Sequence, residues 1–251
     1  MDSLLMTYFN DQVAVVTGAG SGIGKAFALG LAEKGALLCL VGRRMEMLET
    51  VATSARKFGT KAVCYQADLT ADESFRGIPD LVKRDFGHVD LLLHCAGTIT
   101  LGRMESAPLE AFDRQYRINV RAPFALTQAL LPMLITRRGQ IVFINSSAGI
   151  KALPNVCQYA ATKHALKAVA DSLRAEVNAE GIRVMSVYPR RTATPMQASV
   201  HEWEGREYSP ERLMQPEDVA DVVIHALCLP RTAEVTDIFI RPMMNPYSRG
   251  I

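Results

Sequence analysis

A glycine-rich loop between a predicted strand and a predicted helix constrains the fold more than any other feature of this chain. Val13–Val16 is a short apolar run, Thr17–Gly24 reads T-G-A-G-S-G-I-G, and Lys25–Lys34 carries apolar residues at helical spacing. Glycines in this context allow a tight turn and let backbone N–H groups approach a pyrophosphate at the helix N-terminus. The alternative is an ordinary glycine-rich turn. We predict that the loop binds a dinucleotide through Gly18, Gly20, Ser21, Gly22, Ile23 and Gly24.

Strand-like and helix-like patterns alternate along the whole chain, without a linker or a low-complexity stretch. The predicted strands are Val13–Val16, Leu37–Val41, Ala62–Gln66, Leu91–His94, Ile141–Asn145, Val184–Tyr188 and Val235–Ile240. The predicted helices are Gly24–Lys34, Met45–Phe58, Asp72–Phe86, Leu109–Arg138, Val156–Glu180 and Pro216–Leu229. Near-continuous apolar strands are typical of a parallel sheet that is covered on both faces. We therefore predict a single α/β domain over residues 1–251, with a Rossmann-like, doubly wound sheet of about seven mostly parallel strands. Residues 1–10 are expected to form a loose tail.

Tyr159 and Lys163 lie four residues apart in a segment with helical character, so their side chains share one helix face. A lysine ammonium beside a phenol favours the phenolate and lowers the tyrosine pKa from its usual value of about 10. A tyrosine tuned in this way can act as a general acid or base. Ser146, at the end of a predicted strand, is placed to hold a substrate carbonyl oxygen. Such a pair also occurs on solvated helix faces, and the glycine loop is what favours the catalytic interpretation.

Taken together, these motifs resemble the short-chain dehydrogenase/reductase family over nearly the whole chain. Thr17–Gly24 matches that family's cofactor loop T-G-x-x-x-G-x-G, and Tyr159 with Lys163 matches its Y-x-x-x-K pair. Ser146 matches its catalytic serine by distance from the tyrosine and by the glycine three residues on. The resemblance implies hydride transfer between a nicotinamide and a ketone or secondary alcohol. It also implies that Tyr159 exchanges the proton and that Lys163 additionally holds the nicotinamide ribose.

The same resemblance assigns roles to polar residues outside the central pair. Asn119 matches a helix asparagine that would position a water linking Lys163 to solvent, and Asp68 matches an aspartate that meets the adenine amino group. Thr194 matches a residue that contacts the carboxamide. Asn119 alone also fits a helix-capping or core polar group. The other predicted cofactor contacts are Leu69, Cys95, Ala96, Gly97, Pro189, Arg190 and Thr192.

The chain departs from the family pattern at two positions. Cys95 stands where the family usually has asparagine, and a thiol is the weaker hydrogen-bonding group. Arg190 stands where the family usually has glycine, and it would be strained if the backbone there needs positive φ. Arg190 would otherwise contact cofactor or substrate, or extend into solvent. These departures keep open a second hypothesis, a dinucleotide-binding sensor or regulatory subunit without catalysis. A nucleotide-sugar epimerase needs a larger C-terminal domain than the residues after Thr194 supply.

The end of the second predicted strand indicates the cofactor. NAD-preferring Rossmann folds carry an acidic residue there, which holds the ribose 2′-OH. Here Gly42 occupies that position, followed by Arg43 and Arg44. A guanidinium binds a 2′-phosphate bidentately, so we predict NADP(H) rather than NAD(H), with Arg43 as the nearer contact. The alternative, two solvated arginines at a helix start, is disfavoured because the helix dipole prefers anions there.

The segment 195–215 is predicted to form a lid over the substrate. It mixes charges with large side chains: Met196, His201, Trp203, Tyr208 and Met214. These side chains either line an apolar pocket or anchor the segment to the body. Arg190 and Lys151 are candidates for a substrate carboxylate. The substrate class stays open among a thioester-linked β-ketoacyl group, a steroid-like or polyketide-like ketone and a sugar-like polyol.

Composition excludes several classes of partner. The 251 residues are 49% hydrophobic and 22% charged, as in soluble globules, and the net charge of +2 gives no support to nucleic-acid binding. No apolar run approaches a membrane span and no secretory signal is expected. Five scattered cysteines suit a reducing cytoplasm, and the dispersed histidines predict no metal site. The resemblance implies a homodimer or homotetramer through the Ala- and Leu-rich stretch Val120–Leu134, with core packing as the competing explanation.

Overall fold

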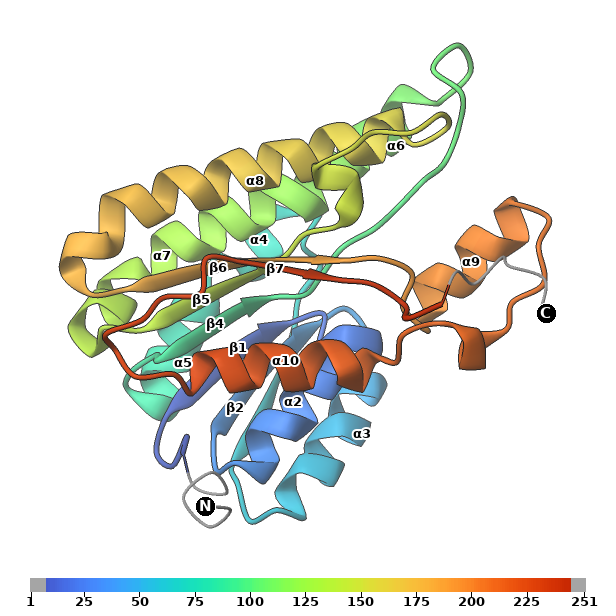
Figure 1. Ribbon diagram of the computed structural model, residues 1–251. Helices are drawn as coiled ribbons and strands as arrows, with labels where there is room; N and C mark the ends of the chain where they lie inside the picture. Colours follow the sequence, from blue (N-terminus) through green and yellow to red (C-terminus); the bar gives the residue numbers. More distant parts are fainter. Residues whose placement is uncertain (1–7, 245–251) are drawn as a thin grey trace.

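The computed structural model describes residues 8–244, and its centre is one seven-stranded, wholly parallel sheet (Figure 1). The strand order is β3-β2-β1-β4-β5-β6-β7. The strands are β1 (Val13–Thr17), β2 (Leu37–Gly42), β3 (Ala62–Gln66), β4 (Leu91–His94), β5 (Gln140–Ile144), β6 (Arg183–Pro189) and β7 (Asp237–Ile240). All seven predicted strands are therefore confirmed. The order reverses between β1 and β4, which is where open α/β sheets bind ligands beyond their carboxyl ends.

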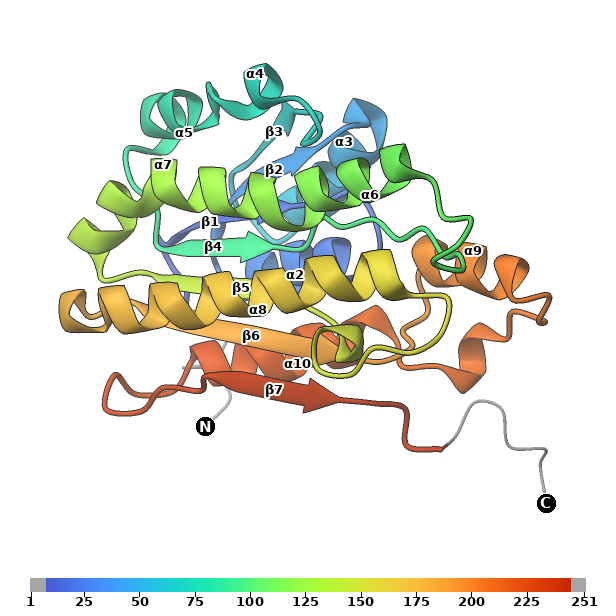
Figure 2. The same cartoon turned by 90° about the horizontal axis from the view of Figure 1, so that it is seen from above.

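Two layers of helix cover the sheet (Figures 1 and 2). One layer contains α2 (Gly22–Glu33), α3 (Met45–Arg56) and α10 (Pro216–Leu227). The other contains α4 (Asp72–Phe75), α5 (Ile78–Phe86), α6 (Leu109–Tyr116), α7 (Ala122–Arg137) and α8 (Cys157–Val177). Each layer has its own core, since alternate strand residues such as Val15 and Val16 pack into opposite clusters. This double burial explains why the strands are apolar along their length.

Two of the predicted helices are not continuous α-helices. The predicted helix Asp72–Phe86 divides into α4 and α5, because Gly77 caps a new helix whose first turn contains Pro79. Proline has no N–H and is favoured in the first turn of a helix, where that N–H would have no partner within the helix. The predicted helix Leu109–Arg138 contains a π-helical turn, Arg117–Arg121, between α6 and α7. Such turns recur at functional sites, and this one contains Asn119.

The long helical stretch Leu109–Arg137 differs from the expectation that no segment would be of membrane-spanning length. By length and composition alone it could cross a membrane, but half of its apolar window is buried inside the protein. Leu126, Leu130 and Leu134 belong to the core beneath the sheet. The core helix of a soluble protein passes the same test, so the stretch by itself does not indicate a membrane protein.

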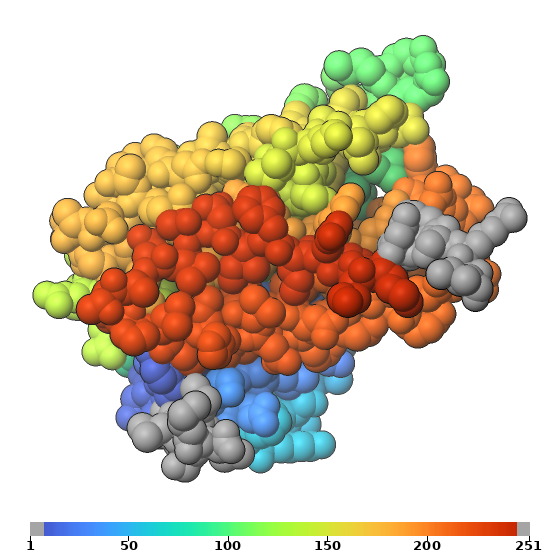
Figure 3. All heavy atoms as spheres, in the orientation of Figure 1, coloured from blue at the N-terminus to red at the C-terminus, as the bar shows by residue number. Residues whose placement is uncertain are grey.

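The ends of two predicted segments also differ from expectation. Of the predicted N-terminal tail, residues 1–7 lie outside the described residues, whereas Phe9 is fully buried in the core and its N–H donates to Lys34 O. The predicted lid, residues 195–215, contains helix α9 (Pro195–Trp203) and a 3-10 turn, Pro210–Arg212. In Figure 1, α9 lies beyond the ends of the strands, and Figure 3 shows the orange atoms at the same end of the molecule.

Candidate active site

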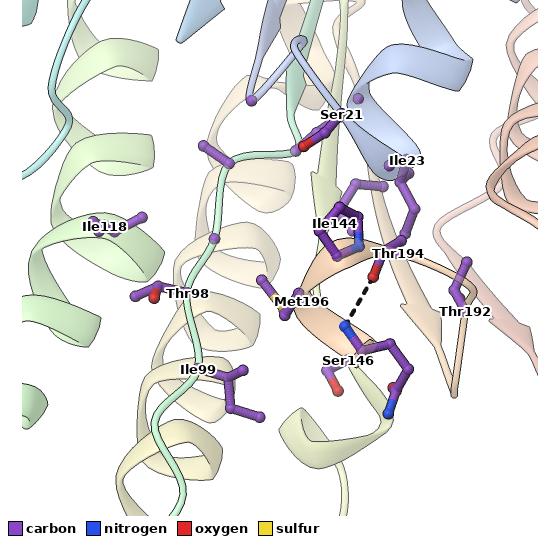
Figure 4. Close-up of a pocket in the computed structure, with 18 of the residues that line it drawn as sticks. Ser21, Ile23, Thr98, Ile99, Ile118, Ile144, Ser146, Thr192, Thr194 and Met196 are labelled. Carbon is purple, nitrogen blue, oxygen red and sulfur yellow. Dashed lines mark hydrogen bonds between the residues drawn. The ribbon is translucent and has the colours of Figure 1, made fainter. Parts of the chain in front are cut away.

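A cavity of about 470 Å³ lies at the carboxyl ends of the strands. It is lined by the glycine loop, by the segments that follow β2 to β6, by the first turns of α8 and by α9. All the predicted site residues line it except Asn119, which is fully buried next to it. Figure 4 shows part of this lining, where Ser21 and Ile23 of the loop lie across the cavity from Ser146.

The glycine loop fits closely against its neighbours because its glycines have no side chains. A Cβ on Gly18, whose φ is +67°, would lie 2.8 Å from Ala96 Cα, and a Cβ on Gly24 would lie 2.4 Å from Gly18 O. Gly22, with φ of +53°, approaches the Thr194 side chain in the same way. The first N–H groups of α2 have no partner within the helix and face an anion-binding position. This cradle fits the pyrophosphate of a dinucleotide.

The segments after β2 and β3 form the far end of the cavity. Gly42 leaves this edge without a carboxylate, and a Cβ there would lie 3.2 Å from Leu48 Cδ2. Arg43 and Arg44 are exposed and line the cavity at the start of α3. Hydrogen bonds from Thr70, followed by the charges of Arg43 and Arg114, hold the pKa of Asp68 below its ordinary value. This end therefore combines cationic side chains with one ionised carboxylate.

Thr17, for which the sequence predicted no role, supports the end of β4. Its Oγ1 accepts hydrogen bonds from the backbone N–H groups of Cys95 (3.1 Å) and Ala96 (3.2 Å). The end of β4 is thus held through its backbone N–H groups. Thr17, on the neighbouring strand β1, supplies the support that the Cys95 side chain was expected to give only weakly. Burial raises the pKa of the Cys95 thiol, so this side chain is a neutral part of the wall. The sequence signal that could have indicated this role is the threonine at the first position of the glycine motif.

The catalytic candidates come from β5 and α8. Ser146 follows β5 in extended backbone, its N–H donates to Asn145 Oδ1 (2.9 Å), and its Oγ accepts from Ala148 N (3.1 Å). Asn145 Nδ2 in turn donates to Lys163 O at 3.1 Å, which joins the two elements. A Cβ on Gly149 would lie 2.4 Å from Asn145 Oδ1, so only glycine permits this approach. The strand end and α8 are thereby locked together.

The structure brings Tyr159, Ser146 and Lys163 together inside the cavity. Tyr159 and Ser146 both line the cavity, Ser146 lowers the pKa of the Tyr159 hydroxyl, and Lys163 Nζ lies 5.8 Å from the centroid of the Tyr159 ring. Lys163 is only 3% exposed, and its Nζ donates to Ile144 O at 2.8 Å. The arrangement presents two hydroxyls to one position, with a buried amine close to them.

The ionisation of this group differs from the expectation drawn from the sequence. Burial raises the pKa of Tyr159 to about 12, while the hydrogen bond with Ser146 lowers it. Burial lowers the pKa of Lys163 to about 8. The expected net lowering of the pKa of Tyr159 is therefore wrong for this structure, because burial raises it. Tyr159 carries its proton at neutral pH, as a proton donor must.

Asn119 has a supporting position in the structure. Its side chain accepts from Thr98 N (2.9 Å) and donates to Thr98 O (2.9 Å) and Thr162 Oγ1 (3.0 Å). These contacts tie the segment after β4 to α8 through the π-helical turn. A Cβ on Gly97 would lie 3.4 Å from Asn119 Oδ1 and 3.9 Å from Lys163 Nζ, so Asn119 lies behind the catalytic group.

The segment after β6 accommodates Arg190 without strain. In the described part of the chain the non-glycine residues with positive φ are Asp11, Arg138 and Asn155. Arg190 therefore needs no glycine-like backbone; it is exposed, and its N–H donates to Ile240 O at 3.0 Å. Thr194 caps α9 by accepting from Gln197 N at 3.2 Å, the dashed line in Figure 4.

The lid side chains divide between the two predicted roles. Met196 lines the cavity, whereas Met214 is buried in the core and Trp203 is half exposed outside the lining. His201 is buried and makes contacts within the lid, with Gln197 O and, edge to face, with the Tyr208 ring. The sequence did not single out the apolar lining residues Ile99, Leu101, Leu153, Val156 and Val200.

No group of three or more His, Cys, Asp or Glu side chains that could hold a metal ion occurs between residues 8 and 244.

Comparison with known proteins places the chain in a family. Residues 12–205 match the short chain dehydrogenase family. An uncharacterized oxidoreductase of Staphylococcus epidermidis is 31% identical over 239 residues, which are 95% of this chain and 100% of that protein. The glycine betaine reductase ATRR of Emericella nidulans is 33% identical over 240 residues, but these are 94% of this chain and only 19% of that protein.

Solved structures agree with this assignment. An alcohol dehydrogenase of Thermococcus sibiricus complexed with 5-hydroxy-NADP has a TM-score of 0.85 at 26% identity and covers 96% of this chain and 99% of its own. An NAD⁺-bound xylitol dehydrogenase has a TM-score of 0.85 at 29% identity and covers 93% and 99%. The L-sorbose reductase of Gluconobacter frateurii, complexed with NADPH and L-sorbose, has a TM-score of 0.83 at 28% identity and covers 94% and 97%.

The chain belongs to the short-chain dehydrogenase family. It is an oxidoreductase of this class that acts with a nicotinamide dinucleotide.

Proposed function

We propose that this protein is an NADP(H)-dependent oxidoreductase that interconverts a ketone and a secondary alcohol, with Tyr159 as the general acid and base. The observation that carries the proposal is that Ser146, Tyr159 and the buried Lys163 line the same cavity as the glycine loop. Two hydroxyls directed at one position fit a carbonyl oxygen that gains negative charge. A sensor would have no need of this pair with Lys163 buried beside it.

In the direction of reduction, a nicotinamide dinucleotide held by the glycine loop would supply the hydride for the carbonyl carbon. Tyr159 Oη donates its proton to the carbonyl oxygen as the C–H bond forms and the carbonyl π electrons move to that oxygen. Ser146 Oγ donates a hydrogen bond to the same oxygen and stabilises the developing charge. Lys163, protonated below its pKa of about 8, faces the tyrosinate that remains and stabilises it. Oxidation of the alcohol reverses these steps.

The preference for NADP(H) is supported by the far end of the cavity. Gly42 offers no carboxylate to the ribose 2′-OH, while Arg43 and Arg44 line the cavity there. A carboxylate would repel a 2′-phosphate and a guanidinium would bind it. Arg43 is the better candidate because its charge already reaches Asp68 at this end of the cavity. Related structures hold both NAD⁺ and NADPH, so the proposed preference for NADP(H) depends on Arg43 and Arg44.

Two further proposals concern the setting of the enzyme. Self-association is proposed on the side of α7, where Phe124 is 51% and Ile135 is 36% exposed and α8 lies alongside (Figures 1 and 2). Exposed aromatic and aliphatic side chains on one helix are typical of a protein–protein contact. A reducing cytoplasmic setting is proposed from the free thiols of all five cysteines.

Tyr159→Phe tests the proposed function. The variant removes one oxygen from the cavity, and we expect kcat/KM for reduction of ketones with NADPH to fall at least about 100-fold, the usual range for a lost general acid. Binding of NADPH should change little, and Tyr116→Phe, outside the cavity, is the matched control. Full activity of Tyr159→Phe would refute the assigned mechanism.

A further inference from the structure

Apolar side chains from three separate segments converge on the catalytic part of the cavity. Ile99 and Leu101 follow β4, Leu153 and Val156 precede Tyr159, and Met196 and Val200 belong to α9; we call these six residues the apolar wall. Figure 4 shows Ile99, Met196 and Ser146 around the same part of the cavity. Both the Met196 methyl group and Lys163 Nζ would lie 3.9 Å from a Cβ on Gly97, so Met196 approaches the same side of Gly97 as Lys163.

Part of the apolar wall is exposed to solvent. Leu153 is 57% exposed and Met196 is 38% exposed, although both line a concave site. A backbone hydrogen bond joins two segments of the wall: Gly102 N, next to Leu101, donates to Asn155 O, next to Val156, at 2.8 Å. Exposed apolar surface in a preformed cavity is typical of a ligand site, because a ligand removes it from water.

Three of the polar side chains that line the cavity are already hydrogen-bonded within the protein. Both polar side-chain atoms of Asn145 are used by Ser146 N and Lys163 O. Gln197 Nε2 contacts His201 Nδ1 at 3.2 Å, and Thr194 Oγ1 accepts from Gln197 N. At these positions a substrate with many hydroxyls would lose its water without gaining matching partners, which costs binding free energy.

The charged residues of the cavity lining are placed elsewhere or paired. Arg43 and Arg114 act on Asp68 at the far end. Arg191 and Glu204, at the lid, form an ion pair of 2.6 Å. Lys163 belongs to the catalytic group. Arg44 lies with Arg43 at the far end, and Lys151 is not part of the lining. Among the cations of the lining, Arg190 is then the one through which an anionic substrate would have to bind, and it is exposed at the end of β6.

We propose, building on the proposed function, that the substrate is an uncharged and largely apolar ketone or secondary alcohol whose hydrocarbon part covers the apolar wall. The carbonyl oxygen faces Ser146 and Tyr159, and the alkyl or aryl substituent extends over Leu153 and Met196. The site thus selects by apolar area and discriminates against carboxylated and polyhydroxylated ketones of the same size. Each methylene that the wall covers contributes about fourfold to kcat/KM, equivalent to about 0.8 kcal/mol.

A series of ketones tests this inference. Methyl ketones of increasing alkyl length, their ω-carboxylated counterparts and a polyhydroxylated ketone of similar size are compared by kcat/KM with NADPH. We expect a rise of about fourfold for each of the first added methylenes and at least a tenfold lower value for carboxylated and polyhydroxylated members. Leu153→Ala should lower kcat/KM for the longest methyl ketone about fivefold, or about 1 kcal/mol, because about half of Leu153 is available for contact.

Leu109→Ala is the matched control, because Leu109 is 74% exposed and lies outside the cavity lining. The inference is overturned if kcat/KM is independent of alkyl length, or if the carboxylated ketones are preferred and lose that preference in Arg190→Ala. A binding measurement distinguishes failure of the substrate inference from failure of the proposed function. Thermal unfolding of the NADPH-loaded protein records how much secondary alcohols of increasing length stabilise it. Length-dependent stabilisation without turnover of any ketone would contradict the proposed function and support the apolar wall.

Discussion

Lys163→Met is predicted to make the cofactor-free protein more stable while it disables the reaction. The pKa of Lys163 falls from 10.5 to about 8 through burial, so keeping the ammonium buried at pH 7 costs about 3 kcal/mol. Methionine has a similar unbranched shape and carries no charge. The variant loses the hydrogen bond to Ile144 O, which costs about 1 kcal/mol. The net gain of about 2 kcal/mol corresponds to a rise in Tm of roughly 4–8 °C.

The pH dependence of this gain identifies its cause. Below pH 8 Lys163 is protonated in both the folded and the unfolded chain, so the wild type bears the full cost of burying the charge. Between pH 8 and 10.5 the folded protein has released that proton while the unfolded chain keeps it, so wild-type stability rises with pH. Above pH 10.5 the amine is neutral in both states, and the advantage of Lys163→Met disappears.

Urea unfolding at several pH values, without cofactor and at fixed protein concentration, measures the effect. Lys167→Met is the matched control on the same helix; it is partly exposed and pairs with Asp171, so its free energy of unfolding should change by less than about 1 kcal/mol. The reasoning is refuted if Lys163→Met is less stable than the wild type at pH 7, or if its stability difference from the wild type is the same at pH 7 and pH 10.5.

Three further predictions concern the cofactor, the loop and assembly. Arg43→Ala should raise the Kd for NADPH by about tenfold or more and leave that for NADH unchanged in titrations, and a smaller effect than in Arg44→Ala would contradict the assignment. Gly24→Ala should lose more than about 2 kcal/mol in urea unfolding because its Cβ would meet Gly18 O, whereas Gly77→Ala, with open space around it, should not; equal stabilities would contradict the close fit. Phe124→Arg should reduce the sedimentation coefficient toward that of a monomer, and an unchanged value would exclude this face from assembly.

The sequence predicted the features that depend on local patterns. The central parallel strands are short apolar runs that both helical layers bury, so their composition located them. The glycine loop was visible because Gly18 and Gly24 are demanded by close backbone contacts rather than by distant packing. The helix break before Pro79 also had a local signal, which the apolar spacing of the surrounding residues obscured.

Other features depend on contacts between distant segments and could not be predicted. The pKa of Tyr159 is set by its burial, which the four-residue spacing to Lys163 does not reveal. Asn119 has its partners in the segment after β4 and in α8, 21 and 43 residues away. The apolar wall assembles from three segments whose hydrophobic residues look like ordinary core in the sequence.

The central claim is that Tyr159 protonates a carbonyl oxygen while a hydride from NADPH reaches its carbon. The most direct measurement incubates the protein with NADPH deuterated at C4 of the nicotinamide and a methyl ketone, and analyses the alcohol by mass spectrometry. We predict one deuterium on the carbinol carbon for the wild type and loss of product in Tyr159→Phe. Binding of NADPH without transfer of deuterium to any ketone tested, or equal transfer in Tyr159→Phe, would contradict the claim.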